Sequence, residues 1–156
     1  MSILPERKTE KAIAAYLASV AGLTSVNVYT RYNLAEIVEP FISVVANSAK
    51  PYVEADPNSG NWSVAVTVSI QSNATGTDAA TKQSDPIEVA GRGLAHDVLV
   101  SSVLDALQAD SVLDAISSYV NTSFSADLLT IGIRKQLVEG DSFLTEQELE
   151  IVIRSS

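Results

Sequence analysis

The chain has 156 residues, 46% of them hydrophobic, and a formal charge of −9 from 10 basic and 19 acidic side chains. This length fits a single domain, residues 1–156, with a core of its own. The absence of cysteine excludes disulfide scaffolds, zinc ribbons, iron–sulfur sites and thiol nucleophiles. The negative net charge argues against a domain that binds nucleic-acid phosphates through a basic face. No apolar run of about 18 residues and no signal-peptide pattern is present, so we expect a soluble protein made in the cytoplasm, without a membrane partner.

The first segment, residues 5–21, is predicted to be a helix. Pro5 suits the first turn, where no amide donor is needed, and Gly22 suits a C-terminal cap. Four apolar side chains have the spacing of one buried stripe, namely Ile13, Tyr16, Leu17 and Val20. Basic and acidic residues alternate in the early turns, and we expect them to form a solvated face: Glu6, Arg7, Lys8, Glu10 and Lys11.

Three strands are predicted next, over residues 26–32, 41–46 and 62–71. The third has the clearest pattern, because five large apolar residues alternate strictly and fix the register: Trp62, Val64, Val66, Val68 and Ile70. Its opposite face is small and hydroxylated, which suits contact with water or with another subunit.

Residues 72–93 read as a long polar loop. Loops of this length in a compact domain are usually functional or disordered. Ile87 and Val89 flank Glu88 and could form a short edge strand. We expect the loop to become ordered on assembly.

Two helices and a hairpin complete the chain. Helical periodicity returns from Leu94 to Leu107, and Asp110 and Ser111 resemble N-cap residues of a second helix that ends over residues 121–125. Alternating segments around residues 129–135 and 149–153 predict a terminal hairpin, with Leu129, Ile131 and Ile133 on one face. Strands and helices occur in blocks, which predicts an α+β fold: a mostly antiparallel sheet with helices packed on one face and a C-terminal β-hairpin.

The sequence carries no recognisable active site. His96, the only histidine, precedes Asp97 at a helix start, and a surface or capping role is expected. Asp105, Asp110 and Asp114 lie around a helix break, where capping explains them better than metal binding. The glycines of residues 91–93 lack the third glycine and the preceding strand of a dinucleotide site. We therefore expect no catalytic residues, no metal and no cofactor.

The order of elements resembles the small tail terminator, or tail completion, proteins of long-tailed bacteriophages. The resemblance covers nearly the full chain: a short helix over residues 6–20, strands closing on residues 62–70, a long polar loop, a helical segment led by His96-Asp97-Val98-Leu99, and a hairpin ending in residues 148–153. It implies a structural virion protein that forms a ring, typically a hexamer, at the top of the tail tube. There it ends tube polymerisation and offers the docking surface for the head.

The resemblance also implies partners. These are further copies of the chain, the tail tube protein and the head–tail connector protein, with DNA passing through without specific binding. It implies neither catalysis nor a cofactor.

A ring needs edges that neighbouring copies complete. Trp62, which is otherwise a core anchor, begins the strand whose hydroxylated face includes Ser63, Thr67 and Ser69. The loop of residues 72–93 is a second candidate. The third is the hairpin tip, where an exposed Phe143 beside Asp141 would be an anchor.

Glu148 and Glu150 alternate with the apolar residues of the last strand, so we expect them on a solvent or lumen face. A negative lumen wall would repel DNA phosphates. A plain polar sheet face is the alternative.

Two other functions fit the sequence. The first is another neck or tail-tube component, which would continue to stack into tubes. The second is a small-molecule-binding or enzymatic α+β domain with its site under the loop of residues 72–93, which would be a monomer or dimer with a polar pocket.

Overall fold

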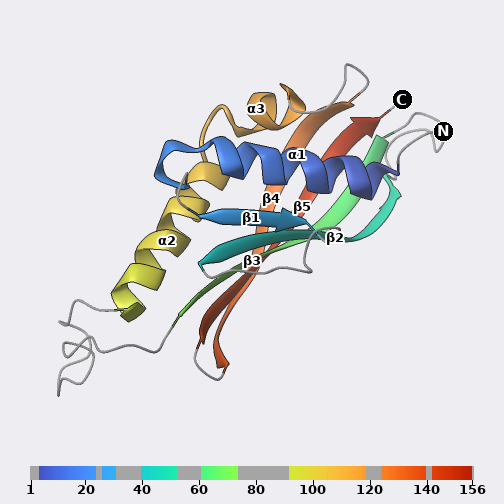
Figure 1. The fold of residues 1–156 in the computed structure, drawn as a ribbon. Coiled ribbons are helices and arrows are strands. Elements are labelled where there is room, and N and C mark those ends of the chain that lie inside the picture. Colours follow the sequence, from blue (N-terminus) through green and yellow to red (C-terminus); the bar gives the residue numbers. More distant parts are fainter. Residues whose placement is uncertain are drawn as a thin grey trace.

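A computed structural model describes residues 4–23, 26–30, 40–52, 61–73, 92–118, 124–139 and 142–155 (Figure 1). The helices are α1 (Pro5–Ser19), α2 (Arg92–Leu107) and α3 (Val112–Ser118), with a short 3₁₀ turn, η1 (Ala21–Leu23). The strands are β1 (Asn27–Thr30), β2 (Phe41–Pro51), β3 (Asn61–Asn73), β4 (Phe124–Glu139) and β5 (Ser142–Ser155).

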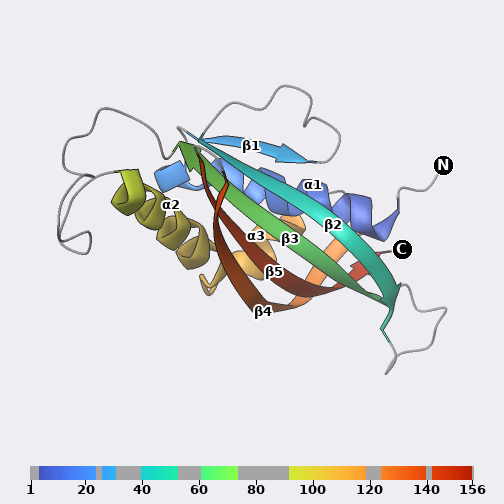
Figure 2. The same ribbon diagram turned by 90° about the horizontal axis from the view of Figure 1, so that it is seen from below.

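The five strands form one sheet in the order β1-β2-β3-β5-β4. Only the β1–β2 pair is parallel, and the other three pairs are antiparallel. Within the described residues, the helices pack on one face of the sheet, and none covers the other face of β2, β3, β5 and β4 (Figure 2). The predicted α+β class, the mostly antiparallel sheet and the C-terminal hairpin are confirmed.

The core lies between the helices and one face of the sheet. The predicted alternation of β3 is confirmed, because Val64, Val66, Val68 and Ile70 are buried with the stripe of α1. These side chains face their partners on the neighbouring strands, as in the pairs Ile42↔Ile70 and Val66↔Leu149. A one-residue slip of any central strand would move its apolar side chains out of this core.

The charged face predicted for α1 is wrong, because part of it is buried. Lys8 and Glu10 are 7% and 1% exposed, whereas Lys11 is exposed. Glu10 faces a bulge between Ala46 and Ser48 of β2, where its Oε2 accepts a hydrogen bond from the Ala46 amide at 3.0 Å. The carboxylate thus satisfies a buried donor in this irregular stretch of the ladder.

Several predicted boundaries differ from the structure: β2 runs to Pro51 rather than to residue 46, and both hairpin strands are longer than predicted. α3 ends at Ser118 and β4 has begun by Phe124, so residues 124 and 125 belong to the strand rather than to the end of the helix. β3 extends to Asn73 and α2 begins at Arg92, which shortens the predicted loop at both ends. The rest of that loop, including Ile87 and Val89, lies outside the described residues.

Candidate assembly surface

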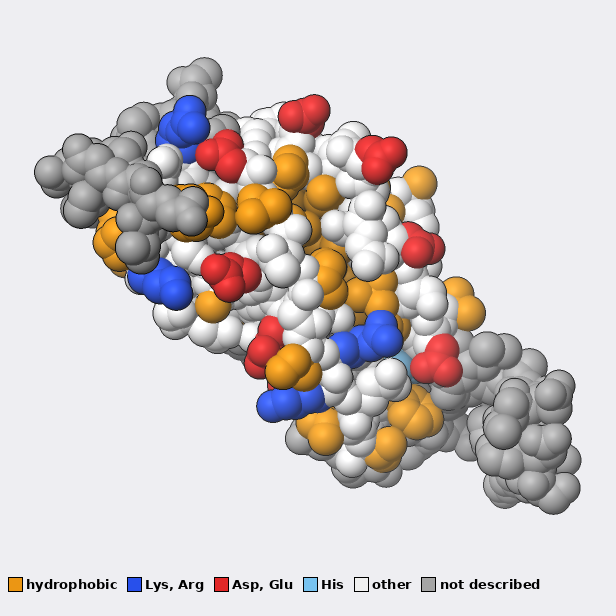
Figure 3. All heavy atoms as spheres, turned by 180° about the vertical axis from the view of Figure 1, so that it is seen from behind, with side chains coloured by type: hydrophobic (Ala, Val, Ile, Leu, Met, Phe, Trp, Pro, Cys, Tyr) orange, Lys and Arg blue, Asp and Glu red, His pale blue; other side chains and the backbone are white. Residues whose placement is uncertain are grey.

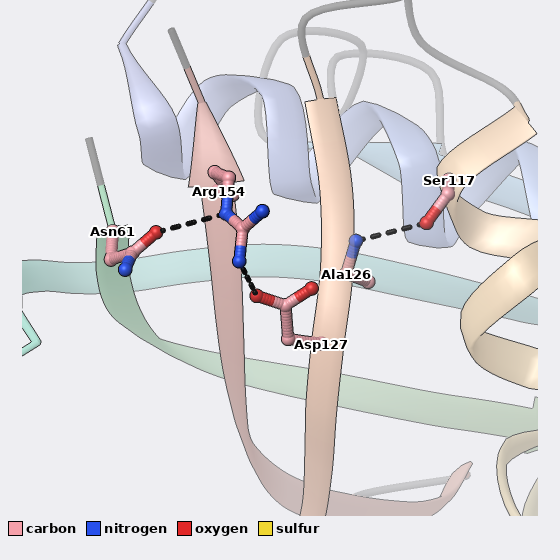
Figure 4. A network of polar contacts seen from close by, with 5 residues as sticks. All are labelled: Asn61, Ser117, Ala126, Asp127 and Arg154. Atoms are coloured by element: carbon pink, nitrogen blue, oxygen red, sulfur yellow. Dashed lines mark hydrogen bonds and ion pairs between the residues drawn. The ribbon is translucent and has the colours of Figure 1, made fainter. Parts of the chain in front are cut away.

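β4 is an edge strand of 16 residues, and its first part is held by neighbouring elements (Figure 4). Ser117 of α3 accepts a hydrogen bond from the Ala126 amide at 2.9 Å. Asp127 lies at a bulge and forms an ion pair with Arg154 of β5 at 3.5 Å. Arg154 also donates to Asn61 Oδ1 at 3.4 Å. These contacts occupy the part of β4 next to α3.

The later part of β4, residues 132–138, is exposed throughout, and we call it the arm. It includes three large apolar side chains, Ile133, Leu137 and Val138, which are 64%, 43% and 67% exposed. Arg134 and Lys135 lie between them and are exposed as well. Figure 3, which views the molecule from behind, shows hydrophobic side chains at the surface among basic and acidic ones. A long edge strand with exposed apolar side chains is a site where further chain can pair.

A bulge begins the arm. Gly132 and Ile133 occupy the place of one residue opposite Glu148, between the pairs Ile131↔Leu149 and Arg134↔Gln147. The buried Gln147 amide fixes this shape, because its Nε2 donates to the carbonyl oxygens of Gly132 at 2.9 Å and Glu148 at 3.0 Å. The prediction that Ile133 shares the inner face of Leu129 and Ile131 is therefore wrong.

The helix-free face of the sheet, which we call the outer face, carries an acidic group beside the bulge. Glu148 and Glu150 are exposed there, as expected of a polar face. The Ser63 hydroxyl donates to Glu150 Oε1 at 2.7 Å and holds this carboxylate in place. The two glutamates line a hollow of about 300 Å³, together with residues of β2, β3 and β4 that include Thr67.

The structure places the other predicted interface residues in different settings. Trp62 is half-buried against the core, and Ser63 is buried. Thr67 and Ser69 are half-buried on the outer face, and Thr67 accepts a hydrogen bond from Asn47 at 2.6 Å. Asp141 lies outside the described residues.

Phe143 is half-buried rather than an exposed anchor, because it packs against His96 with the ring centroids 5.6 Å apart.

The surface or capping role predicted for His96 is wrong. The side chain is 4% exposed, with Ser72 Oγ 2.7 Å from Nδ1 and Thr145 Oγ1 2.9 Å from Nε2. Burial lowers the pKa of His96 below its ordinary value of 6.5, while Asp97 acts in the opposite direction. His96 thus ties α2 to β3 and β5. It also borders a second hollow, of about 270 Å³, next to Leu137 and Val138.

The sequence did not predict that the arm forms an exposed surface, nor that His96 is a buried residue that connects α2 to β3 and β5. The strand pattern of residues 129–135 contained one signal for the bulge, the isolated Gly132, because a glycine inside a strand is typical of a bulge.

The described part of the chain offers no other obvious site chemistry. Within it, no cluster of three or more histidine or acidic side chains could hold a metal ion. Among the same residues, no helix has the length and apolarity needed to cross a membrane.

The chain matches no protein-family model and no curated protein sequence.

Proposed function

We propose that this chain is a structural, non-enzymatic virion subunit that assembles into a ring, typically a hexamer, at the head–tail junction of a long-tailed phage. The exposed arm at the edge of the sheet is the observation that carries the proposal. Its apolar side chains are stabilised when another chain covers them. The order of the elements, which resembles that of tail terminator proteins, adds the biological setting.

In this role the protein acts by shape. One end of the ring covers the last layer of the tail tube protein and so ends polymerisation, and the other end receives the head–tail connector protein. The opening admits DNA without binding it, which agrees with a formal charge of −9, since acidic surfaces repel phosphates. No cofactor takes part.

Size-exclusion chromatography with light scattering, followed by negative-stain electron microscopy, tests this proposal. We expect a closed ring whose mass stops rising as the protein concentration increases. Continued stacking into tubes would favour a tail-tube subunit instead. A strict monomer at high concentration would overturn the ring and favour the small-molecule-binding alternative.

A further inference from the structure

We propose that neighbouring copies join by placing the arm of one copy on the outer face of the next, with Lys135 against the carboxylates of Glu148 and Glu150. The inference rests on the proposed self-assembly and names the surfaces that perform it. The two surfaces differ from each other, and such a contact repeats from copy to copy until a ring closes.

The arm has the chemistry of a binding surface. Lys135 is exposed and forms no ion pair within the part of the chain that the structure describes. The strand register places it opposite Glu146, on the helix-free side of β4, whereas Arg134 lies opposite the buried Gln147 and projects to the other side. Ile133 and Leu137 flank Lys135, and a contact that excluded water around its ammonium group would strengthen its pairing with carboxylates.

The outer face supplies the opposite charge. Glu148 and Glu150 project from β5 with one residue between them, and the Ser63 hydroxyl orients the second carboxylate. The hollow of about 300 Å³ that they line gives room for a side chain of the neighbouring arm.

Overall charge favours a contact with local complementarity. Copies with a formal charge of −9 repel each other at long range, and a contact that sets a basic side chain against acidic ones lowers this repulsion. The arm holds two of the 10 basic residues at the apolar edge of the sheet, and Lys135 is the one on the helix-free side.

A charge-swap experiment tests the contact. Variant R134E/K135E makes the arm acidic, and variant E148R/E150R makes the outer face basic. We expect each variant alone to be monomeric by light scattering, since its arm and outer face then carry like charges. An equimolar mixture, or the fourfold variant, restores complementary contacts and should recover an oligomer of wild-type size.

The design contains its own control for total charge, because the first variant lowers the net charge by four and the second raises it by four. D105R/D114R, which changes exposed residues of α2 and α3, also raises the net charge by four and should assemble like the wild type. Circular dichroism confirms that each variant is folded.

The outcomes separate this inference from the proposed function. If the wild type and both charge variants form the same ring, the proposed contact is wrong and the proposal of a ring stands. Variants that dissociate but fail to reassemble when mixed would also overturn the contact. A monomeric wild type would overturn both proposals. A wild-type dimer that obeys the charge swap would support the contact and overturn the ring.

Discussion

At the scale of single residues, His96 shows how one polar side chain can join three elements. It is carried by α2 and contacts hydroxyl groups of β3 and β5, while its ring packs on Phe143. Thr145 is fully buried, so its hydroxyl depends on a partner inside the protein. Neutral imidazole suits this place because one ring nitrogen donates and the other accepts.

Replacing His96 with alanine should lower the free energy of unfolding by about 2–4 kcal/mol, because it leaves a cavity and an unpaired buried hydroxyl. Urea unfolding measures the loss. V98A, at a position of the same helix that is 58% exposed, is the control and should change stability by at most about 0.5 kcal/mol. An H96A variant as stable as the control would contradict the structural role of the imidazole.

Stability should also depend on pH through His96. Its pKa is lowered in the folded state, so the contribution of the neutral imidazole is fully present above pH 6.5 and is lost as pH falls through the lower folded pKa. We expect the stability difference between wild type and H96Q to shrink between about pH 7.5 and pH 5. Measuring both proteins cancels the carboxylate titrations they share, and a constant difference would argue against this assignment.

At the scale of elements, two bulges are fixed by side chains from elsewhere. The bulge in β2 uses the carboxylate of Glu10 in α1, and the bulge in β4 uses the amide of Gln147 in β5. Each of these side chains is 1% exposed. Burying their polar groups costs free energy, which their hydrogen bonds to the backbone must offset. The bulges are therefore specific features of the sheet.

Removing the Glu10 side chain should destabilise the protein. E10A leaves the Ala46 amide without this acceptor, at a cost of about 1–3 kcal/mol in the free energy of unfolding. E10Q retains an acceptor oxygen and should lose less. Thermal or urea unfolding ranks the variants, with K11A as the exposed neighbour that should behave like the wild type. Equal stability of E10A and K11A would show that the contact contributes nothing.

Gly132 should resist replacement by alanine. A Cβ atom there would lie 3.1 Å from the backbone oxygen of Glu148. Because this close neighbour belongs to the backbone and not to a flexible side chain, it cannot easily move away. We expect G132A to lose about 1–2 kcal/mol and to disturb the arm. Unfolding titrations measure the first effect, and amide hydrogen exchange of residues 132–138 measures the second. Unchanged exchange would mean that the arm tolerates a side chain at this position.

The sequence predicted much of the fold because apolar periodicity reports which face of an element is buried. The strict alternation from Trp62 to Ile70 identified the central strand and its inner face, and the spacing of Ile13, Tyr16 and Leu17 identified the buried stripe of α1. Periodicity says nothing about polar residues that are buried by partners far away in the chain. Glu10, His96 and Gln147 find their partners only in the folded molecule, so the bulge that begins the arm could not be located in advance, whereas the alternation of the last strand placed Glu148 and Glu150 on a polar face.

At the scale of the whole molecule, the two edges of the sheet differ in length. β1 has four residues and pairs in parallel with β2, whereas β4 has 16 and ends in the exposed arm. The surplus of acidic side chains opposes contact between copies at long range. We expect the length of the β4 edge and the net charge to favour one defined contact at the arm over general aggregation.

The same charge predicts behaviour toward DNA. A fluorescently labelled duplex should show no change in anisotropy with the protein at low salt, where phosphate contacts would be strongest. Binding that weakens steeply with added salt would reveal a basic surface that the formal charge conceals, and would contradict passage of DNA without contact.

The start of α1 and the end of β5 lie together at one end of the molecule, away from the end of β4 and the start of β5 (Figures 1 and 2). Fluorescent proteins or affinity tags fused to either terminus should accordingly point away from the arm. Two differently coloured fusions can then report energy transfer between subunits in living cells, with the joining surface left uncovered.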